Sequence, residues 1–202
     1  ITVTGVNDGS VDGDISHAIT LSVIDAQSDA TYDPVSDVVV QNTTADNASA
    51  GFTVTQSGGS TAVAETGSTD TFTVALTAQP TNDVVISVTS GDTGEATVDT
   101  AELTFTNGDW NNAQTVTVTG INDDLDDGNI SATITLAVVD AESDNAFDNA
   151  ANQTVGVVNA DNDTAGFTIA HTDGATVVTE DATTDVFTLV LNAQPASDVV
   201  LS

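Results

Sequence analysis

The sequence contains no Lys, Arg, Cys or Met among its 202 residues, and only two His. Without basic side chains the chain has no positive patch, so we expect it to bind neither nucleic acid nor an anionic membrane surface. Without Cys it can form neither disulfides nor thiolate metal sites. Composition alone therefore argues against nucleic acid and anionic membranes as partners, and it excludes disulfides and thiolate metal sites as structural supports.

Negative charge, in contrast, is abundant, because 31 residues are Asp or Glu. Two carboxylates about 5 Å apart repel by roughly 3 kcal/mol at an effective dielectric constant near 20. No Lys or Arg side chain is available to offset such repulsion. Each carboxylate must therefore be solvated, accept hydrogen bonds, or be matched by a cation from solution.

Long hydrophobic runs are also missing, and no segment approaches the roughly 18 apolar residues that suggest a membrane-spanning helix. No signal peptide is visible, so we expect any targeting signal to lie elsewhere in a longer parent chain. Aromatic residues make up only 4% of the chain, while Thr and Val are abundant. That composition favours strands. The apolar residues alternate in ordered runs, which is not typical of disordered acidic chains.

The chain repeats itself with an offset of 115 residues, the distance from Gly5 to Gly120. The opening segment ITVTGVNDGSVDGDIS returns as VTVTGINDDLDDGNIS, and GFT at 51–53 returns at 166–168. A unit of this length is typical of an independently folding domain. We therefore predict the C-terminal part of a first repeat at 1–50, a complete repeat at 51–165 and the N-terminal part of a third at 166–202.

One repeat contains nine segments of strand-like character and no convincing helical periodicity. Phe52, Phe72, Phe105 and Trp110 are the expected large core residues, and Val, Ile and Leu the remainder. The pattern predicts tandem all-β, immunoglobulin-like domains, each an antiparallel β-sandwich. The predicted strands cover 51–56, 61–65, 70–78, 83–90, 95–99, 102–106, 114–120, 130–140 and 153–161.

Carboxylates concentrate at particular turns of the complete repeat. Loops at one end of a sandwich converge in space, and Asp-rich loops supply the six to eight oxygens that Ca²⁺ prefers. No long linker separates the repeats, so neighbouring domains should nearly touch. We therefore predict calcium near the junctions. The candidate ligands are Glu65, Glu95, Asp123, Asp124, Asp126, Asp127, Asp161 and Asp163.

Several of these acidic positions recur in the partial repeats. Two simpler interpretations compete with calcium binding: Asp favours turns in any protein, and a salt-adapted surface is acidic throughout. Recurrence at the same positions favours the calcium interpretation. The ligand number can differ between copies, since Gly9, Val11 and Ala48 replace Asp124, Asp126 and Asp163. The further predicted ligands are Asp8, Asp12, Asp46 and Glu180.

Three segments together resemble the Calx-beta domain: GINDDLDDGN after a TVTVTG strand, the Glu of VAETGSTDTFTV, and NADND. The chain especially resembles the degenerate Calx-beta-like repeats of giant bacterial surface and adhesin proteins, and the resemblance covers the whole chain. It implies a seven-stranded immunoglobulin-like sandwich that holds calcium at one tip, near the next domain. The family's ligand positions correspond to Glu65, Glu95, the acidic loop of Asp123, Asp124, Asp126 and Asp127, and the terminal Asp161 and Asp163.

This sequence departs from the family pattern in two places. Gly128 and Asn129 stand where the acidic loop usually carries Glu, and Asn162 interrupts the final run of Asp. His17 and His171 match Ala132 and Gln56 in the other copy, so neither belongs to the repeated set. No nucleophile elbow, P-loop or HExxH motif occurs. We therefore expect no enzymatic activity.

The sequence favours a structural role outside the cell. We expect spacer repeats of a long secreted or cell-surface adhesin-like protein, stiffened by calcium, whose partners are the neighbouring repeats and possible further copies in a fibre. Two alternatives stay open: a subunit of a self-assembling filament or sheath, and a module that binds a glycan or another cell. Electron microscopy would distinguish the filament, and a surface patch confined to one copy would indicate the binding module.

Overall fold

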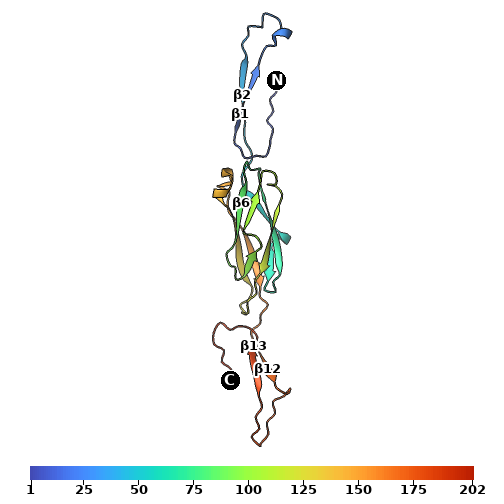
Figure 1. Cartoon of the computed structure of the whole chain (residues 1–202), viewed down its shortest axis with the longest axis vertical. Coiled ribbons are helices and arrows are strands. Elements are labelled where there is room, and N and C mark those ends of the chain that lie inside the picture. Colours follow the sequence, from blue (N-terminus) through green and yellow to red (C-terminus); the bar gives the residue numbers. More distant parts are fainter.

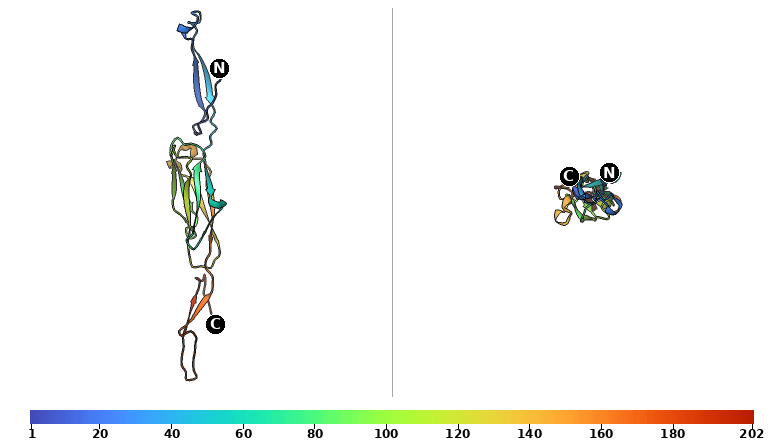
Figure 2. Two further views of the ribbon diagram at one scale, coloured as in Figure 1. Left: turned by 90° about the vertical axis from the view of Figure 1, so that its right-hand side faces the viewer. Right: turned by 90° about the horizontal axis from the view of Figure 1, so that it is seen from above.

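A computed structural model describes residues 1–202 and shows an elongated, all-β molecule. A β-sandwich occupies the middle, and one β-hairpin extends from each end of it along the same long axis (Figures 1 and 2). The only helices are four single turns of 3-10 helix, none of which is long and apolar enough to cross a membrane. These turns are η1 (Asp25–Gln27), η2 (Ser57–Gly59), η3 (Asp140–Glu142) and η4 (Asn145–Phe147).

The sandwich consists of two sheets with nine strands, and all nine predicted segments form them. The resemblance to the Calx-beta domain implied seven, so the strand count differs. In spatial order, the four-stranded sheet contains β3 (Phe52–Gln56), β5 (Thr69–Leu76), β9 (Gln114–Gly120) and β7 (Ala96–Val98). The five-stranded sheet contains β4 (Thr61–Ala64), β11 (Gln153–Ala160), β10 (Ile130–Val138), β6 (Val84–Ser90) and β8 (Glu102–Phe105).

The chain crosses from one sheet to the other at the turn between β3 and β4. Gly58 and Gly59 both have positive φ angles, 62° and 85°. Residues with a Cβ rarely adopt this backbone conformation. As a result β3 joins the four-stranded sheet, whereas β4 pairs with β11 on the opposite side. This β4–β11 pair is parallel, while all other ladders are antiparallel.

The core lies between the two sheets. Phe52, Phe72 and Phe105 are buried in it, as predicted, whereas Trp110 is only half-buried and packs against its edge. Phe147 of η4 is fully buried although no strand pattern marks it. Alternation along β9 shows how the sequence builds this core, because its valines face inward and its threonines lie nearer the solvent.

The two hairpins reproduce parts of the sandwich. β1 (Ile15–Leu21) pairs with β2 (Val38–Thr44) in the register of β10 with β11. β12 (Phe167–His171) pairs with β13 (Phe187–Leu191) in the register of β3 with β5. Their apolar residues face solvent because no second sheet covers them: Val40 is 43% exposed, whereas the corresponding Val155 is fully buried. The repeat therefore extends from sequence to strand register.

Candidate metal sites at the tip of the sandwich

The acidic tip is the end of the sandwich that faces β12 and β13, and its topology explains why distant carboxylates meet there. β4 and β11 run parallel, so their C-terminal ends lie together, and Glu65 N donates to Ala160 O at 3.1 Å. Glu65 follows β4 directly, and Asp161 follows β11 directly. β9 ends and β10 begins at the same tip, with the acidic loop between them.

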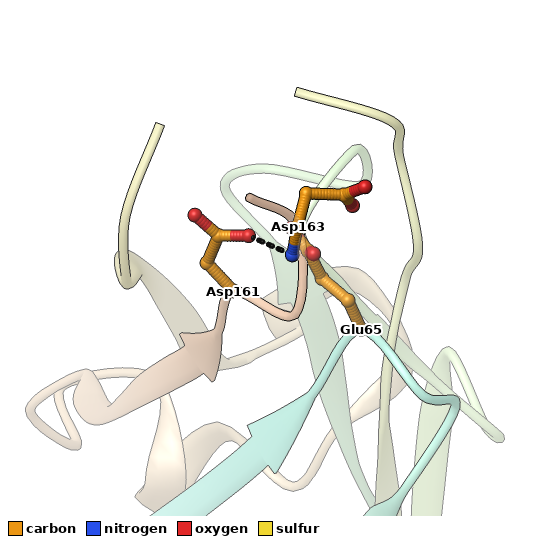
Figure 3. A group of neighbouring side chains, drawn as sticks. All are labelled: Glu65, Asp161 and Asp163. Atoms are coloured by element: carbon orange, nitrogen blue, oxygen red, sulfur yellow. Dashed lines mark hydrogen bonds between the residues drawn. The ribbon is translucent and has the colours of Figure 1, made fainter. Parts of the chain in front are cut away.

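Glu65, Asp161 and Asp163 form the first group of carboxylates. Their oxygen atoms lie within 4.8 Å of one another, and all three side chains gather above the strand ends (Figure 3). Glu65 is buried, with 4% of its surface exposed. Asp161 Oδ1 accepts a hydrogen bond from Asp163 N at 2.6 Å. Oxygens bound to one Ca²⁺ at about 2.3–2.6 Å are at most about 5 Å apart, so this spacing fits a shared cation.

Burial and repulsion from neighbouring carboxylates raise the pKa of two carboxyl groups in this group. The hydrogen bond from Asn162 N lowers the pKa of Glu65, but burial and the charges of Asp161, Asp123 and Asp163 outweigh it, so the pKa is raised overall. Burial raises the pKa of Asp163, and repulsion from Asp124 and three further Asp adds to the effect. The ionised forms are thus destabilised by their neighbours.

Glu95, Asp123 and Asp127 form the second group, and their oxygen atoms also lie within 4.8 Å of one another. Glu95 precedes β7, and the two Asp belong to the loop between β9 and β10. Asn159 positions Glu95 within this group, because its Nδ2 donates to Glu95 Oε2 at 3.1 Å and to Ile121 O at 2.8 Å. Asn159 is buried, and its Oδ1 is without a hydrogen-bond partner.

The two remaining predicted ligands of the sandwich form hydrogen bonds at the junction with the following repeat. Asp126 Oδ2 accepts a hydrogen bond from Ala165 N at 2.6 Å, at the start of the next repeat. Asp124 contributes its backbone oxygen to Gln194 N at 2.6 Å. Neither side chain belongs to a group of three carboxylates. These two residues therefore connect the acidic loop to the segment that follows.

The predicted ligands in the partial repeats are not assembled into such groups. Asp46 Oδ2 accepts hydrogen bonds from Asp12 N and Gly13 N at 3.2 and 2.9 Å, and Asp8 Oδ1 accepts one from Ser10 N at 3.0 Å. Glu180 is exposed in the connection between β12 and β13. Asp46 Oδ2 accepts from Gly13 N as Asp161 Oδ2 accepts from Gly128 N, so the loop geometry of the acidic tip recurs in the first repeat.

Sequence reasoning missed Asn159 because only acidic residues were considered as candidates. The repeat would not have revealed it either, since Thr44 occupies the corresponding position. The signal that could have found it is position, because Asn159 continues the buried alternation of Val155 and Val157 two residues before Asp161.

The donor chemistry of both groups suits a hard cation. Only oxygen atoms are available, and neither His nor Cys is present in either group. Carboxylate and amide oxygens are the ligands preferred by Ca²⁺ and Mg²⁺. Each group of three carboxylates offers three to six oxygens, depending on whether each binds through one or both. The residues present thus fit a calcium ion.

Comparison with known proteins reveals structural likeness only. No protein-family model matches the chain, and no curated protein sequence matches it significantly. The apo-form Calx CBD1 domain is 13% identical with a TM-score of 0.38, and the match covers 55% of this chain and 98% of that domain. Domains 4 and 5 of the S-layer protein SbsC are 24% identical with a TM-score of 0.37, and the match covers 61% of this chain and 52% of that one.

A third similar structure is SSP-19, an MSP-domain protein like family member in Caenorhabditis elegans. It is 14% identical with a TM-score of 0.36, and the match covers 53% of this chain and 97% of that one. Each match thus extends over roughly half of the chain or somewhat more. The all-β fold described above rests on the two sheets of this chain itself.

Proposed function

We propose that the chain consists of structural extender repeats, similar to Calx-beta domains, from a long secreted or cell-surface adhesin-like protein. In this proposal residues 51–165 form one complete domain, and residues 1–50 and 166–202 are parts of neighbouring domains. Calcium at the tip of each complete domain stiffens the array, and the repeats carry out no catalysis. Their partners are the adjoining repeats of the same chain.

The observation that carries the proposal is the position of the group Glu65, Asp161 and Asp163. It lies where one repeat passes into the next, in a chain without a single Lys or Arg to offset it. Asp163 is only three residues from Gly166, the start of the following repeat. A cation bound there would restrain the segment between two domains.

The shape of the molecule supports extension rather than enclosure of a ligand. The hairpins continue the long axis of the sandwich in both directions, and the view along that axis is compact (Figure 2). Each repeat therefore adds length, not width. Repeats that contact only their sequence neighbours form stiff, quasi-linear arrays whose stability depends on the interfaces between them.

Thermal unfolding with and without calcium tests the proposal. Extracellular calcium modules have dissociation constants of about 0.1–1 mM, so about 10 mM calcium should stabilise each site by roughly 1.4–2.7 kcal/mol. We expect a higher melting temperature in calcium than in chelator, and heat of binding in calorimetric titration. An unchanged melting temperature together with an absence of binding heat would remove calcium from the proposal.

Matched variants show which carboxylates are responsible for the stabilisation by calcium. Glu65→Gln removes a buried carboxylate whose pKa is raised, so above that pKa it removes repulsion from the folded state. We expect Glu65→Gln to melt higher than the unaltered chain in chelator, and to gain less from calcium by the contribution of its own group of carboxylates. Glu102→Gln removes one exposed charge of β8, outside both groups, and should keep the full gain. Equal gains in both variants would place the calcium elsewhere.

A further inference from the structure

The same backbone pairing joins neighbouring repeats at both ends of the sandwich. Gln79 N donates to Gly9 O at 3.0 Å, and Gln194 N donates to Asp124 O at 2.6 Å. The two bonds are equivalent, because donor and acceptor are each displaced by 115 residues. Each is part of a parallel β-bridge between a Gln-Pro turn and the acidic loop of the preceding repeat. The bridged pairs are Ser10 with Gln79 and Leu125 with Gln194.

This pairing depends on backbone atoms and not on carboxylates. Gly9 and Val11 occupy the first loop where Asp124 and Asp126 occupy the second. The first junction nevertheless has the bridge, and a further bond there joins Val11 N to Gln79 O at 3.3 Å. A junction can therefore form this contact whether or not its loop carries the full acidic set.

The Gln-Pro turn is itself anchored to the body of the sandwich. Gln79 Nε2 donates to Asn107 O at 2.9 Å, and Asn107 Nδ2 donates to Pro80 O at 2.7 Å. Asn107 lies in the turn between β8 and β9. The turn is thus fastened to its own domain through side chains and to the preceding repeat through its backbone.

The bridge is a second attachment beside the covalent connection. The chain passes from one repeat to the next through residues 49–51, where Thr77 Oγ1 donates to Ser49 O at 2.8 Å. One flexible connection alone would let the two domains rotate about its φ and ψ angles. Two attachments at different places remove that rotation and leave one relative direction.

We propose that the Gln-Pro turns at 78–80 and 193–195 are docking elements between domains, whose partner is the acidic loop of the preceding repeat. The bridge sets the mean direction of each domain relative to its neighbour. This role goes beyond the proposed function and does not depend on it. A cation at the tip restricts the amplitude of motion, whereas the bridge determines the direction in which the array extends.

Distance measurements between two spin labels test this proposal in the complete chain. The chain has no Cys, so introduced cysteines are its only thiols. Thr20→Cys in β1 and Thr104→Cys in β8 place labels at exposed positions on either side of the first junction. We expect one dominant distance in the otherwise unaltered chain, in calcium and in chelator alike, because this junction has no group of three carboxylates.

Two variants at one position separate the backbone from the side chain. Gln79→Pro removes the N–H that bonds to Gly9 O, and loss of one such bond should raise the undocked fraction about fivefold. Gln79→Ala keeps this N–H and leaves the Asn107–Pro80 bond intact, so it should retain the dominant distance. Val11→Pro removes the N–H that donates to Gln79 O, and Val11 lies in the preceding repeat, outside the sandwich. It should therefore broaden the distance distribution as Gln79→Pro does, and it tests the proposal even if Gln79→Pro misfolds.

The results distinguish this proposal from the proposed function. An unchanged distribution in Val11→Pro and in a folded Gln79→Pro would overturn the docking role. Loss of the dominant distance from the unaltered chain in chelator would also overturn it, because the cation would then set the direction. Failure of calcium to bind or to raise the melting temperature contradicts the proposed function alone and leaves the bridge unaffected.

Discussion

Asp144 lies between η3 and η4, beyond the end of β10 that is opposite the acidic loop, and its carboxylate accepts four hydrogen bonds. Thr81 N and Thr81 Oγ1 donate at 2.7 Å, Asn82 N at 2.9 Å and Ala146 N at 3.0 Å. Burial alone would raise the pKa of Asp144, but these donors outweigh it and lower the pKa. This carboxylate is therefore stabilised by the chain itself and needs no cation.

The lowered pKa of Asp144 predicts an acid-dependent contribution to stability. A carboxyl group with a lower pKa in the folded state stabilises the fold above its unfolded pKa, and the contribution is lost as pH falls through the folded value. We expect Asp144→Asn to cost about 2 kcal/mol at pH 7, the scale of hydrogen bonds to a charged group. The deficit should begin to shrink below about pH 4, where the unfolded chain binds the proton, and should disappear once the folded carboxylate is protonated as well.

Urea unfolding at pH 7 and at progressively lower pH measures this deficit. Asp148→Asn is the control, because Asp148 is exposed and only four residues away. That variant should match the unaltered chain at every pH. A deficit in Asp144→Asn that stays constant down to the lowest pH would show that its carboxylate contributes packing rather than charge.

Single residues of this kind are hard to recognise in a chain with 31 carboxylates. Recurrence is the available signal, since Asp29 occupies the position of Asp144 in the first repeat and accepts hydrogen bonds from Thr31 N and Oγ1. Phe147 was missed for a different reason. It lies in a 3-10 turn, where neither strand alternation nor helical periodicity marks the buried face.

At the scale of elements, the parallel β4–β11 pair lies in close contact with the end of β9. Gly120, the last residue of β9, allows this contact. A Cβ added at Gly120 would collide with Ala64 O and would lie 2.7 Å from Asn159 Oδ1. The two sheets therefore approach each other closely beside the second group of carboxylates, where Asn159 contacts Glu95.

Gly120→Ala should consequently destabilise the sandwich. Overpacking of this kind costs about 1–3 kcal/mol, because the backbone of β4 must shift. Gly156→Ala is the matched control in β11, where an added Cβ would meet no atom within 4 Å. That control should be neutral or more stable by about 0.4–1 kcal/mol. Urea unfolding of both variants decides the matter, and equal stabilities would show that the two sheets can separate without cost.

Strand positions could be predicted at this scale, but strand partners could not. Alternation of Val and Thr identifies the residues of β9 that face the core, and all nine segments were recognised in this way. Alternation does not indicate, however, which neighbouring strand a given strand pairs with. The switch at Gly58 and Gly59 places β4 beside β11 in parallel, and only this pairing brings Glu65 to Asp161. The acidic tip thus depends on a register that the sequence pattern does not specify.

At the scale of the whole molecule, negative charge acts over two different distances. Repulsion between exposed carboxylates along the rod is screened by salt, since the Debye length falls from about 30 Å at 0.01 M to about 3 Å at 1 M ionic strength. Repulsion within the groups at the tip acts between oxygens less than 4.8 Å apart, around a buried Glu65. Such partly buried charges are screened much less.

Because these two kinds of repulsion are screened to different degrees, we expect sodium chloride and calcium to stabilise the chain separately. Raising sodium chloride should increase the melting temperature gradually as the long-range repulsion is screened. Calcium at about 10 mM should add a further increase at every salt concentration, because site binding contributes by mass action. Melting curves at about 0.01 M and about 1 M ionic strength, each with and without calcium, measure both effects. Glu65→Gln should keep the response to sodium chloride and lose the part of the calcium response that the group of Glu65, Asp161 and Asp163 contributes. If the calcium increment vanishes at high salt in the unaltered chain, calcium acts there as a diffuse counterion and the carboxylates at the tip are not its site.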